Sequence, residues 1–363
     1  MTATSTFSVA LANETATAEL MADLALLIGA GDVITLSGDL GAGKTAAARA
    51  LIRYLAADDT LEVPSPTFTL AQSYELPSFP LVHADLYRIN DASELEEIGL
   101  APLPDDIVVL IEWPERAPDA MPADRIDIAL SHRPALGSAA RAAEITGYGK
   151  AAAKVARLNE LRRFLERAGF LSARRERMPG DASTRSYARL RNDDGSVILM
   201  NSPRRPDGPA IYNGRPYSAA VHLAEDVRPF VAIGNGLRKH GFSAPAIRHA
   251  DLESGFLITE DLGGEGVIGA VVYAALADSI SIRKLMLTGV ILIAVGSLLA
   301  FAFSSFWPMV LTGRLIQTAG LAAAETLYVI YVTKHLSEAD QKTYLGFSTA
   351  AFQAGLLIGA LTS

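Results

Sequence analysis

Residues 38–45 read Gly38-Asp39-Leu40-Gly41-Ala42-Gly43-Lys44-Thr45 and match the pattern G-x-x-x-x-G-K-[ST]. They follow an apolar run at 33–36 and precede an alanine-rich segment that is typical of a helix. Glycines let successive backbone N–H groups turn toward one anion, and a helix N-terminus attracts negative charge. The pattern therefore predicts a phosphate-binding loop at residues 39–45, with Lys44 at the β- and γ-phosphates of a nucleotide and Thr45 on Mg²⁺.

The composition limits the kinds of site that the chain can hold. Its 363 residues, half of them hydrophobic, are enough for two or three domains. Cysteine is absent, which excludes disulfides, cysteine-zinc sites and cysteine nucleophiles. The six histidines show no metal-ligand spacing, so Mg²⁺ at phosphates is the metal that we expect.

The charge is distributed unevenly along the chain. Residues 1–150 carry nine Lys and Arg against 22 Asp and Glu, whereas residues 151–267 carry 18 against 14. A domain this acidic lacks the basic surface that binds a phosphate backbone, so we expect no direct nucleic-acid binding by the first part. The first 20 residues show no signal peptide, and we expect residues 1–267 in the cytoplasm.

Two predicted strands of the first part end in a carboxylate. The segment 81–88 carries Asp85, and the apolar run 107–113 ends at Glu112. Strands that alternate with helices predict an α/β sheet, and its ligand site lies at the carboxyl edge of the strands. In phosphate-loop enzymes a strand-end acid holds Mg²⁺, so Thr45 and Glu112 are the expected metal ligands.

Four motifs follow one another along residues 5–149: G-D-L-G-A-G-K-T, S-P-T-F at 65–68, H-A-D-L-Y-R at 83–88 and I-E-W-P at 111–114. In these motifs and their order, residues 5–149 resemble the TsaE (YjeE) family of ATPases, which act in tRNA threonylcarbamoyladenosine formation. The resemblance implies ATP and Mg²⁺ as cofactors and catalytic roles for Lys44, Asp85 and Glu112. It also implies two protein partners, the threonylcarbamoyl-transferase subunit and its paired protein (TsaD and TsaB type).

Several residues near these motifs have two interpretations. By analogy with the family, Asp85 orients or deprotonates the attacking water; alternatively it caps the segment that follows. Thr67 approaches the γ-phosphate or lies in a plain tight turn. Trp113 covers the nucleotide, faces the partners or packs inside the domain. For His83 we expect a structural role.

Residues 150–267 begin with an amphipathic helix at 150–168 and then resemble the N-terminal lobe of aminoglycoside-phosphotransferase-like kinases. The resemblance rests on 178–190, 197–200 and 255–263. Phosphoryl transfer needs an Asp and metal ligands from a C-terminal lobe, which the sequence after 263 does not supply. We therefore expect a partial α+β lobe that is inactive, with His249-Ala250-Asp251 in a surface turn.

Residues 268–363 predict an all-α, transmembrane-like tail. Leu285–Phe303 is an uncharged run of 19 residues, and 309–332 and 344–361 are further candidate spans. Asp278, Arg283 and Lys284, with Arg314, resemble motifs of major facilitator efflux transporters. The tail holds only part of such a transporter, so transport by this chain alone is not expected. A buried helical hairpin is the alternative to membrane insertion.

The sequence thus predicts three domains: an ATPase at 1–149, a partial kinase-like lobe at 150–267 and a transporter-like fragment at 268–363. Three function classes follow, an ATPase in tRNA modification, a fusion with a small-molecule kinase, and a membrane efflux fragment. The first is the prediction that we carry forward because only its chemistry is complete.

Overall fold

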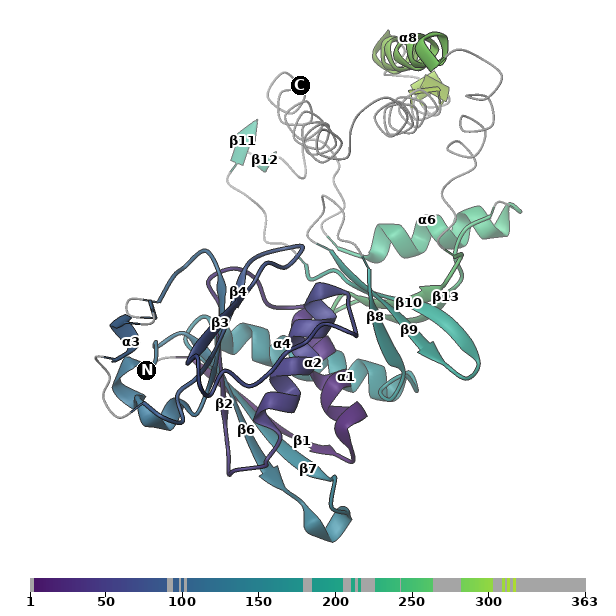
Figure 1. The fold of residues 1–363 in the computed structure, drawn as a ribbon. Coiled ribbons are helices and arrows are strands. Elements are labelled where there is room, and N and C mark those ends of the chain that lie inside the picture. Colours follow the sequence, from purple (N-terminus) through teal and green to yellow (C-terminus); the bar gives the residue numbers. More distant parts are fainter. Residues whose placement is uncertain are drawn as a thin grey trace. The chain divides into compact units, whose positions relative to one another are not determined.

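The computed structural model of the chain describes residues 3–89, 94–97, 99–100, 103–178, 185–204, 210–212, 215–216, 226–241, 243–263, 282–302, 309–310, 312–313 and 316–317. The chain forms two compact units, Met1–Leu262 and Gly263–Ser363. The first unit holds two large β-sheets, a separate two-stranded pair and the helices that pack against the large sheets, and its elements are drawn in Figure 1.

The first sheet has seven strands in the order β1-β7-β6-β2-β5-β4-β3. Its strands are β1 (Thr4–Leu11), β2 (Val33–Ser37), β3 (Ala71–Tyr74), β4 (Leu81–Asp85), β5 (Val108–Glu112), β6 (Arg125–His132) and β7 (Arg141–Tyr148). The strands β6, β2, β5 and β4 run parallel, and β1, β7 and β3 add antiparallel edges. This arrangement confirms the predicted α/β sheet.

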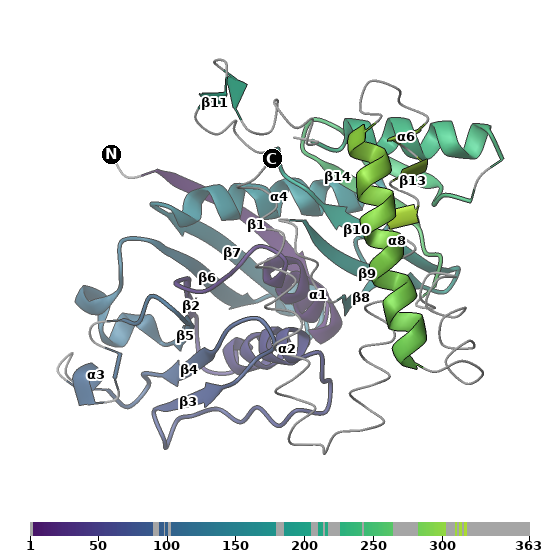
Figure 2. The same cartoon turned by 90° about the horizontal axis from the view of Figure 1, so that it is seen from above.

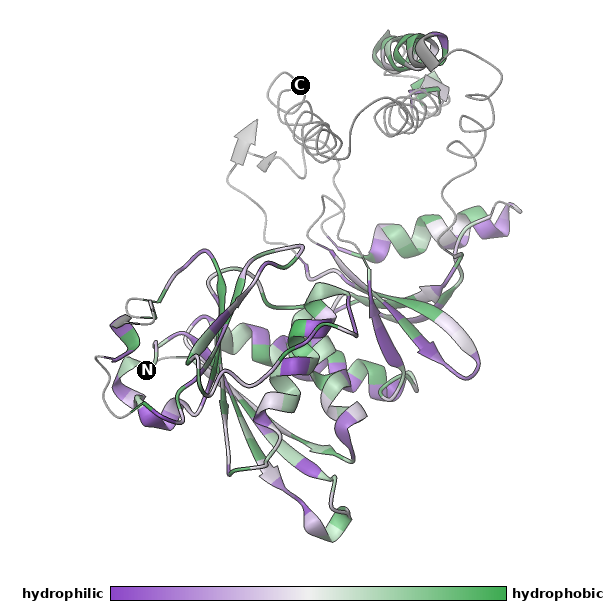
Figure 3. Ribbon diagram, viewed as in Figure 1, coloured by the Kyte–Doolittle hydropathy of each residue, from purple (hydrophilic) through white to green (hydrophobic). Residues whose placement is uncertain are grey.

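Both faces of this sheet are buried. On one face, Leu110 of β5 packs in a core shared by α1 (Glu14–Ala25), α2 (Lys44–Ala56) and α4 (Ala151–Arg167). On the other face, Val109 and Ile111 pack in a smaller core with α3 (Glu94–Glu97) and the loops around η1 (Pro114–Arg116) and η2 (Pro118–Ala120). A third short turn, η3 (Pro134–Leu136), precedes β7. Figure 3 shows the resulting pattern, apolar residues along the strands and in the helices that cover them.

The edge strand β1 was not predicted from the sequence. It carries an alternation that the sequence does show, with Phe7, Val9 and Leu11 packed against or inside the core and the small residues Ser8 and Ala10 exposed between them. Such a period of two is typical of a strand with one buried face. Pairing with β7 completes the sheet.

The second sheet is antiparallel, with the order β13-β14-β10-β9-β8. The elements after α4 are β8 (Arg174–Arg177), β9 (Ser186–Asn192), β10 (Gly195–Asn201), the short pair β11 (Ala210–Tyr212) and β12 (Arg215–Pro216), α6 (Arg228–Lys239), β13 (Ile247–Asp251) and β14 (Phe256–Glu260). The prediction of a surface turn at His249–Asp251 was wrong, because these residues lie in β13 and pair with β14. The expectation of a surface position was correct, since His249 and Ala250 are exposed.

Helix α4 belongs to both cores of the first unit. Val155 and Leu158 lie in the core of the first sheet. Leu161, Phe164 and Leu165 lie in the core of the second sheet, and Phe164 stacks on Phe256 with ring centroids 5.6 Å apart. Figure 2 shows the helix running alongside the first sheet and on to the second. A fragment that ends at residue 149 would lose the apolar residues with which α4 covers the first sheet.

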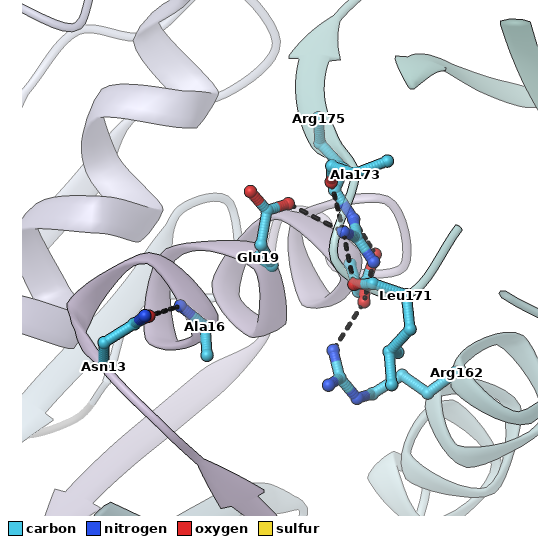
Figure 4. Close-up of polar contacts among 8 residues, drawn as sticks. Asn13, Ala16, Glu19, Arg162, Leu171, Ala173 and Arg175 are labelled. Carbon is cyan, nitrogen blue, oxygen red and sulfur yellow. Dashed lines mark hydrogen bonds and ion pairs between the residues drawn. The ribbon is translucent and has the colours of Figure 1, made fainter. Parts of the chain in front are cut away.

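A buried ion cluster joins α1 to the second sheet (Figure 4). The Arg175 guanidinium on β8 donates from Nη1 to Glu19 Oε2 at 2.8 Å and from Nε to Asp23 Oδ1 at 2.9 Å. Arg162 of α4 donates from Nη1 to Asp23 Oδ2 at 2.7 Å. Arg175 also donates to the carbonyl oxygens of Leu171 and Ala173. All four charged side chains are nine-tenths buried or more, so each charge is stabilised by the opposite charges beside it rather than by water.

The described part of the second unit consists mainly of α8 (Ile282–Ala302). At Gly296 an added Cβ atom would lie 2.4 Å from Gly313 O and from Gln317 N, so the backbone of α8 lies directly against these two residues. Among the residues that the structure describes, no helix has both the length and the apolar character needed to cross a membrane. Asp278, Arg314 and the predicted span 344–361 lie outside the described residues.

Candidate active site

The phosphate-binding loop connects β2 to α2, as predicted. Gly41 and Gly43 have φ angles of 76° and 106°, in the region that favours glycine, and Gly43 precedes the first helical residue, Lys44. At Gly38 an added Cβ atom would lie 2.1 Å from Leu130 O on the neighbouring strand. The loop can therefore be built only with glycine at this point, and it forms the concave backbone that suits an anion.

The ammonium group of Lys44 lies inside its own loop. Nζ donates to Gly38 O at 2.6 Å and to Asp39 O at 3.0 Å, and it lies 3.5 Å from the ring centroid of Trp113. Burial lowers the pKa of Lys44, while nearby carboxylates, first among them Glu112, act in the opposite direction. Trp113 has a φ angle of 60°, which is rare for a large side chain and is found mostly at functional positions. The indole thus forms one wall around the cation.

Three side chains from three elements meet behind the loop. Thr45 Oγ1, in the first turn of α2, donates to Glu112 Oε2 at 2.9 Å, at the end of β5. The other carboxylate oxygen, Oε1, lies 2.9 Å from His83 Nε2 on β4. Glu112 and His83 are fully buried. The sequence predicted the pair of Thr45 and Glu112, whereas it did not predict that His83 contacts the acid.

Asp85 lies beside Glu112, because the register of β4 and β5 pairs the two residues. Its Oδ2 accepts hydrogen bonds from Ser65 Oγ and Thr67 Oγ1, each at 2.8 Å, and its Oδ1 accepts from the backbone N–H of Tyr87 at 3.0 Å. Asp85 therefore has both features that were predicted as alternatives, a position at the site and a local cap. Thr67 lies in a turn, as one of its two interpretations predicted, and its hydroxyl also contacts this acid.

These residues line one cavity of about 310 Å³. Its lining consists of Leu40, Gly41, Gly43, Lys44, Thr45, Ala46, Ser65, Thr67, Asp85, Tyr87, Glu112 and Trp113. Two predicted phosphate-loop residues are absent from it. Ala42 is fully buried, and Asp39 is exposed with its carbonyl oxygen bound to Lys44.

The donor set of the cavity suits Mg²⁺ with a nucleotide better than a metal held by protein alone. Among the described residues, no group of three or more His, Cys, Asp or Glu side chains is arranged to hold a metal ion. Mg²⁺ usually takes one or two protein oxygen ligands together with phosphate oxygens and water. The Thr45 hydroxyl and Glu112 carboxylate, 2.9 Å apart, meet that requirement.

Sequence reasoning missed three contributors to the site. Arg141 of β7 donates from Nε to Ala42 O at 3.0 Å and from Nη2 to Gly41 O at 3.2 Å, and so holds the phosphate-binding loop from a strand 99 residues away. No local signal points to such a contact. Ser65 begins the S-P-T-F motif at 65–68, of which only Thr67 was predicted to lie at the site. His83 could have been found, because it stands two residues before Asp85 and strands place such residues on one face.

Comparison with known proteins gives two family matches. Residues 11–140 match the family described as threonylcarbamoyl adenosine biosynthesis protein TsaE. Residues 253–363 match the Major Facilitator Superfamily, and this match begins within the second sheet of the first unit.

Curated relatives carry the same name as the first match. The tRNA threonylcarbamoyladenosine biosynthesis protein TsaE of Rickettsia bellii is 38% identical over 99 residues, which are 27% of this chain and 68% of that protein. The protein of that name from Streptomyces coelicolor is 37% identical over 140 residues, 36% of this chain and 90% of that protein. In four other Rickettsia relatives the chain spans 58% to 61% of their length.

A solved structure, Bacillus subtilus YdiB, is 26% identical to the chain, with 44% of this chain and 97% of that chain covered at a TM-score of 0.35. The family assignment rests on the sequence matches. Through its first domain, with the phosphate-binding loop and the acids of β4 and β5 around one cavity, this chain belongs to the TsaE family of threonylcarbamoyl adenosine biosynthesis proteins.

Proposed function

We propose that the first domain is an Mg²⁺-dependent ATPase required for threonylcarbamoyladenosine formation in tRNAs that read codons beginning with A. The observation that carries the proposal is the meeting of Lys44, Thr45, Asp85 and Glu112 around one cavity. A phosphate loop, a metal-binding hydroxyl and two strand-end acids are the parts that ATP hydrolysis needs. The names of the curated relatives support the pathway.

Each residue has a role that follows from its position. Lys44 neutralises charge on the β- and γ-phosphates, and the N–H groups of residues 39–45 surround the phosphate oxygens. Thr45 and Glu112 hold Mg²⁺, which when bound adds positive charge where the transferred phosphoryl group becomes more negative. Asp85 orients or deprotonates the attacking water. The hydrogen bonds from Ser65 and Thr67 fix its carboxylate for that task.

Two observations favour protein partners over direct contact with tRNA. Residues 1–150 carry a strong excess of acidic side chains, which opposes binding to a phosphate backbone. Leu40, in the lining of the cavity, and Phe68, next in sequence to the lining residue Thr67, are 78% and 81% exposed. Large apolar side chains in such positions suit a protein interface. We propose that the threonylcarbamoyl-transferase subunit and its paired protein bind there, and that ATP hydrolysis resets their complex between turnovers in the cytoplasm.

The proposed pathway predicts how the ATPase responds to its partners. By itself, the full chain should hydrolyse ATP slowly. The rate of hydrolysis should increase markedly when the two partner proteins are added together, and it should not increase when tRNA alone is added. The measurement is phosphate release at saturating ATP, with each partner alone as the control. An increase that depends on an amino sugar or aminoglycoside, with the partners irrelevant, would favour a kinase instead. Failure of the chain to restore the tRNA modification in cells depleted of their own subunit would contradict the pathway assignment.

The proposed division of labour between the two acids predicts distinct kinetic defects. Glu112→Ala should mainly raise the Mg²⁺ concentration needed for half-maximal activity, since it removes a metal ligand. Asp85→Ala should lower kcat and leave ATP affinity unchanged, since it acts on the water. Steady-state kinetics over a range of Mg²⁺ concentrations separates the two. Glu144→Ala, an exposed acid on β7 outside the cavity, is the matched control and should change neither value. Equal loss of ATP binding in both variants would mean that the two acids do not have separate roles.

We propose further that the chain divides into an ATPase domain (1–149), a kinase-like lobe without activity (150–267) and a transporter-like tail (268–363). The antiparallel second sheet supports an α+β lobe, and the major facilitator match supports the origin of the tail. Membrane insertion of the tail stays a prediction from its sequence.

A further inference from the structure

His83 has a buried environment that defines which of its nitrogen atoms carries the proton. Its side chain is fully buried, and Nδ1 has no hydrogen-bond partner among the described residues. Nε2 lies 2.9 Å from Glu112 Oε1. A proton on Nδ1 would be a buried donor without an acceptor, which is energetically unfavourable. It would also leave the Nε2 lone pair facing a carboxylate oxygen. The neutral form with the proton on Nε2 avoids both penalties, so His83 donates to Glu112.

The contact from His83 determines how Glu112 is turned. One carboxylate oxygen, Oε1, accepts from the imidazole, and the other, Oε2, accepts from Thr45 Oγ1 at 2.9 Å. Thr45 and Glu112 line the cavity, whereas His83 does not. The imidazole therefore holds the carboxylate from the protein side and leaves Oε2 at the cavity.

The strand pattern explains why this histidine is available for the task. Residues two apart on a strand project to the same face, so His83 and Asp85 both leave β4 on the side of the sheet that α2 covers. The parallel register places Asp85 next to Glu112, and His83 two pairs earlier, next to Leu110. One short strand thus supplies both the acid beside Glu112 and the donor behind it.

We infer that His83 is a positioning residue of this site: its Nε2–H group holds Glu112 with Oε2 facing Thr45, and this orientation sets the affinity of the site for a divalent cation. The inference rests on the proposed function, in which Thr45 and Glu112 hold Mg²⁺. Mg²⁺ tolerates little deviation from octahedral geometry, so the direction of its carboxylate ligand matters. Loss of an outer partner that orients a metal ligand typically lowers metal affinity about 10- to 100-fold.

The test measures metal binding directly, with Mn²⁺ as the probe. The purified full chain is mixed with ADP and titrated with Mn²⁺, and free Mn²⁺ is read by electron paramagnetic resonance. His83→Leu, which fills the space without a donor, should weaken Mn²⁺ binding about 10- to 100-fold. ADP binding in excess EDTA should stay within about twofold, because the phosphate loop is untouched. His83→Gln, whose amide N–H reaches about as far as Nε2, should restore most of the Mn²⁺ affinity.

A second comparison separates positioning from general support of the fold. If His83 acts through Glu112, then His83→Leu should cause no further loss of Mn²⁺ affinity in a Glu112→Gln background. Full additivity of the two losses would overturn the inference. So would an unchanged Mn²⁺ affinity in His83→Leu, or a fall in metal-free ADP binding as large as the fall in Mn²⁺ binding.

Misfolding of His83→Leu and the behaviour of Glu112→Gln alone also have defined consequences for the inference. Should His83→Leu fail to fold, His83→Asn replaces it, because the shorter amide does not reach Glu112. Asn should then weaken Mn²⁺ binding where Gln does not, and equal behaviour of the two would contradict the inference. If Glu112→Gln alone leaves Mn²⁺ binding unchanged, the proposed metal site fails and the inference fails with it. If Glu112→Gln weakens Mn²⁺ binding and His83→Leu does not, only the inference fails.

Discussion

Replacing Lys44 by alanine is expected to abolish ATP hydrolysis, with a loss in kcat/KM of at least about 100-fold. Among the described residues that line the cavity, Lys44 is the one basic side chain, so no neighbour can take over its charge. ATP binding should weaken as well, because in the proposed role the ammonium group binds phosphate oxygens in the ground state and in the transition state.

Phosphate release and equilibrium ATP binding by the full chain check this prediction. Lys150→Ala is the matched control, since that side chain is 93% exposed and lies at the start of α4, outside the cavity. The thermal midpoint of each variant shows whether the fold is intact. Unchanged turnover in Lys44→Ala would contradict a role of the phosphate-binding loop in ATP hydrolysis.

The second large effect concerns stability. Arg175→Met should destabilise the first unit by about 3–5 kcal/mol, because it leaves Glu19 and Asp23 buried without their main partner. Burial already raises the pKa of Glu19, and Arg175 is the main group that opposes this shift. In a unit of this size the loss corresponds to a fall of about 10 °C in the midpoint of thermal unfolding. Circular dichroism of the full chain measures that midpoint.

The neighbouring residue provides a control with the same substitution. Arg174 also forms an ion pair, with Asp59, but their side chains are 63% and 76% exposed. Arg174→Met should therefore change stability by less than about 1 kcal/mol. Equal effects of the two substitutions would mean that the cluster does not hold the second sheet to α1. Adding Glu19→Gln and Asp23→Asn to Arg175→Met should recover part of the loss, because it removes the unpaired charges.

The sequence was sufficient for those parts of the site that depend on local pattern. The phosphate-binding loop was recognised from eight residues and their strand–loop–helix setting. Asp85 and Glu112 were expected to meet because each ends an apolar strand, and the register of β4 and β5 does pair them. Parallel strands bring their carboxyl ends to one edge, which makes this kind of inference safe without coordinates.

Contacts between distant segments could not be predicted in the same way. Arg141 reaches the loop only because β7 lies next to β6 and β1 in the sheet, an order that no local pattern specifies. The cluster around Asp23 needs arginines from α4 and β8, more than 130 residues away. The predicted domain boundary at residue 149 also assigned α4 to the second domain alone, although the helix packs on the first sheet as well. Its apolar spacing predicted a helix, but periodicity does not say that two different cores share that helix.

The shared helix has a consequence for motion. Domains joined by an exposed linker rotate about a few residues that change their φ and ψ angles, whereas a continuous, buried α-helix offers no such hinge. Helix α4 is unbroken from Ala151 to Arg167, and the ion cluster adds a second connection through α1. Any rearrangement at the nucleotide would therefore reach the second sheet as a small displacement of packed helices, and the two sheets would move together rather than open like a lid.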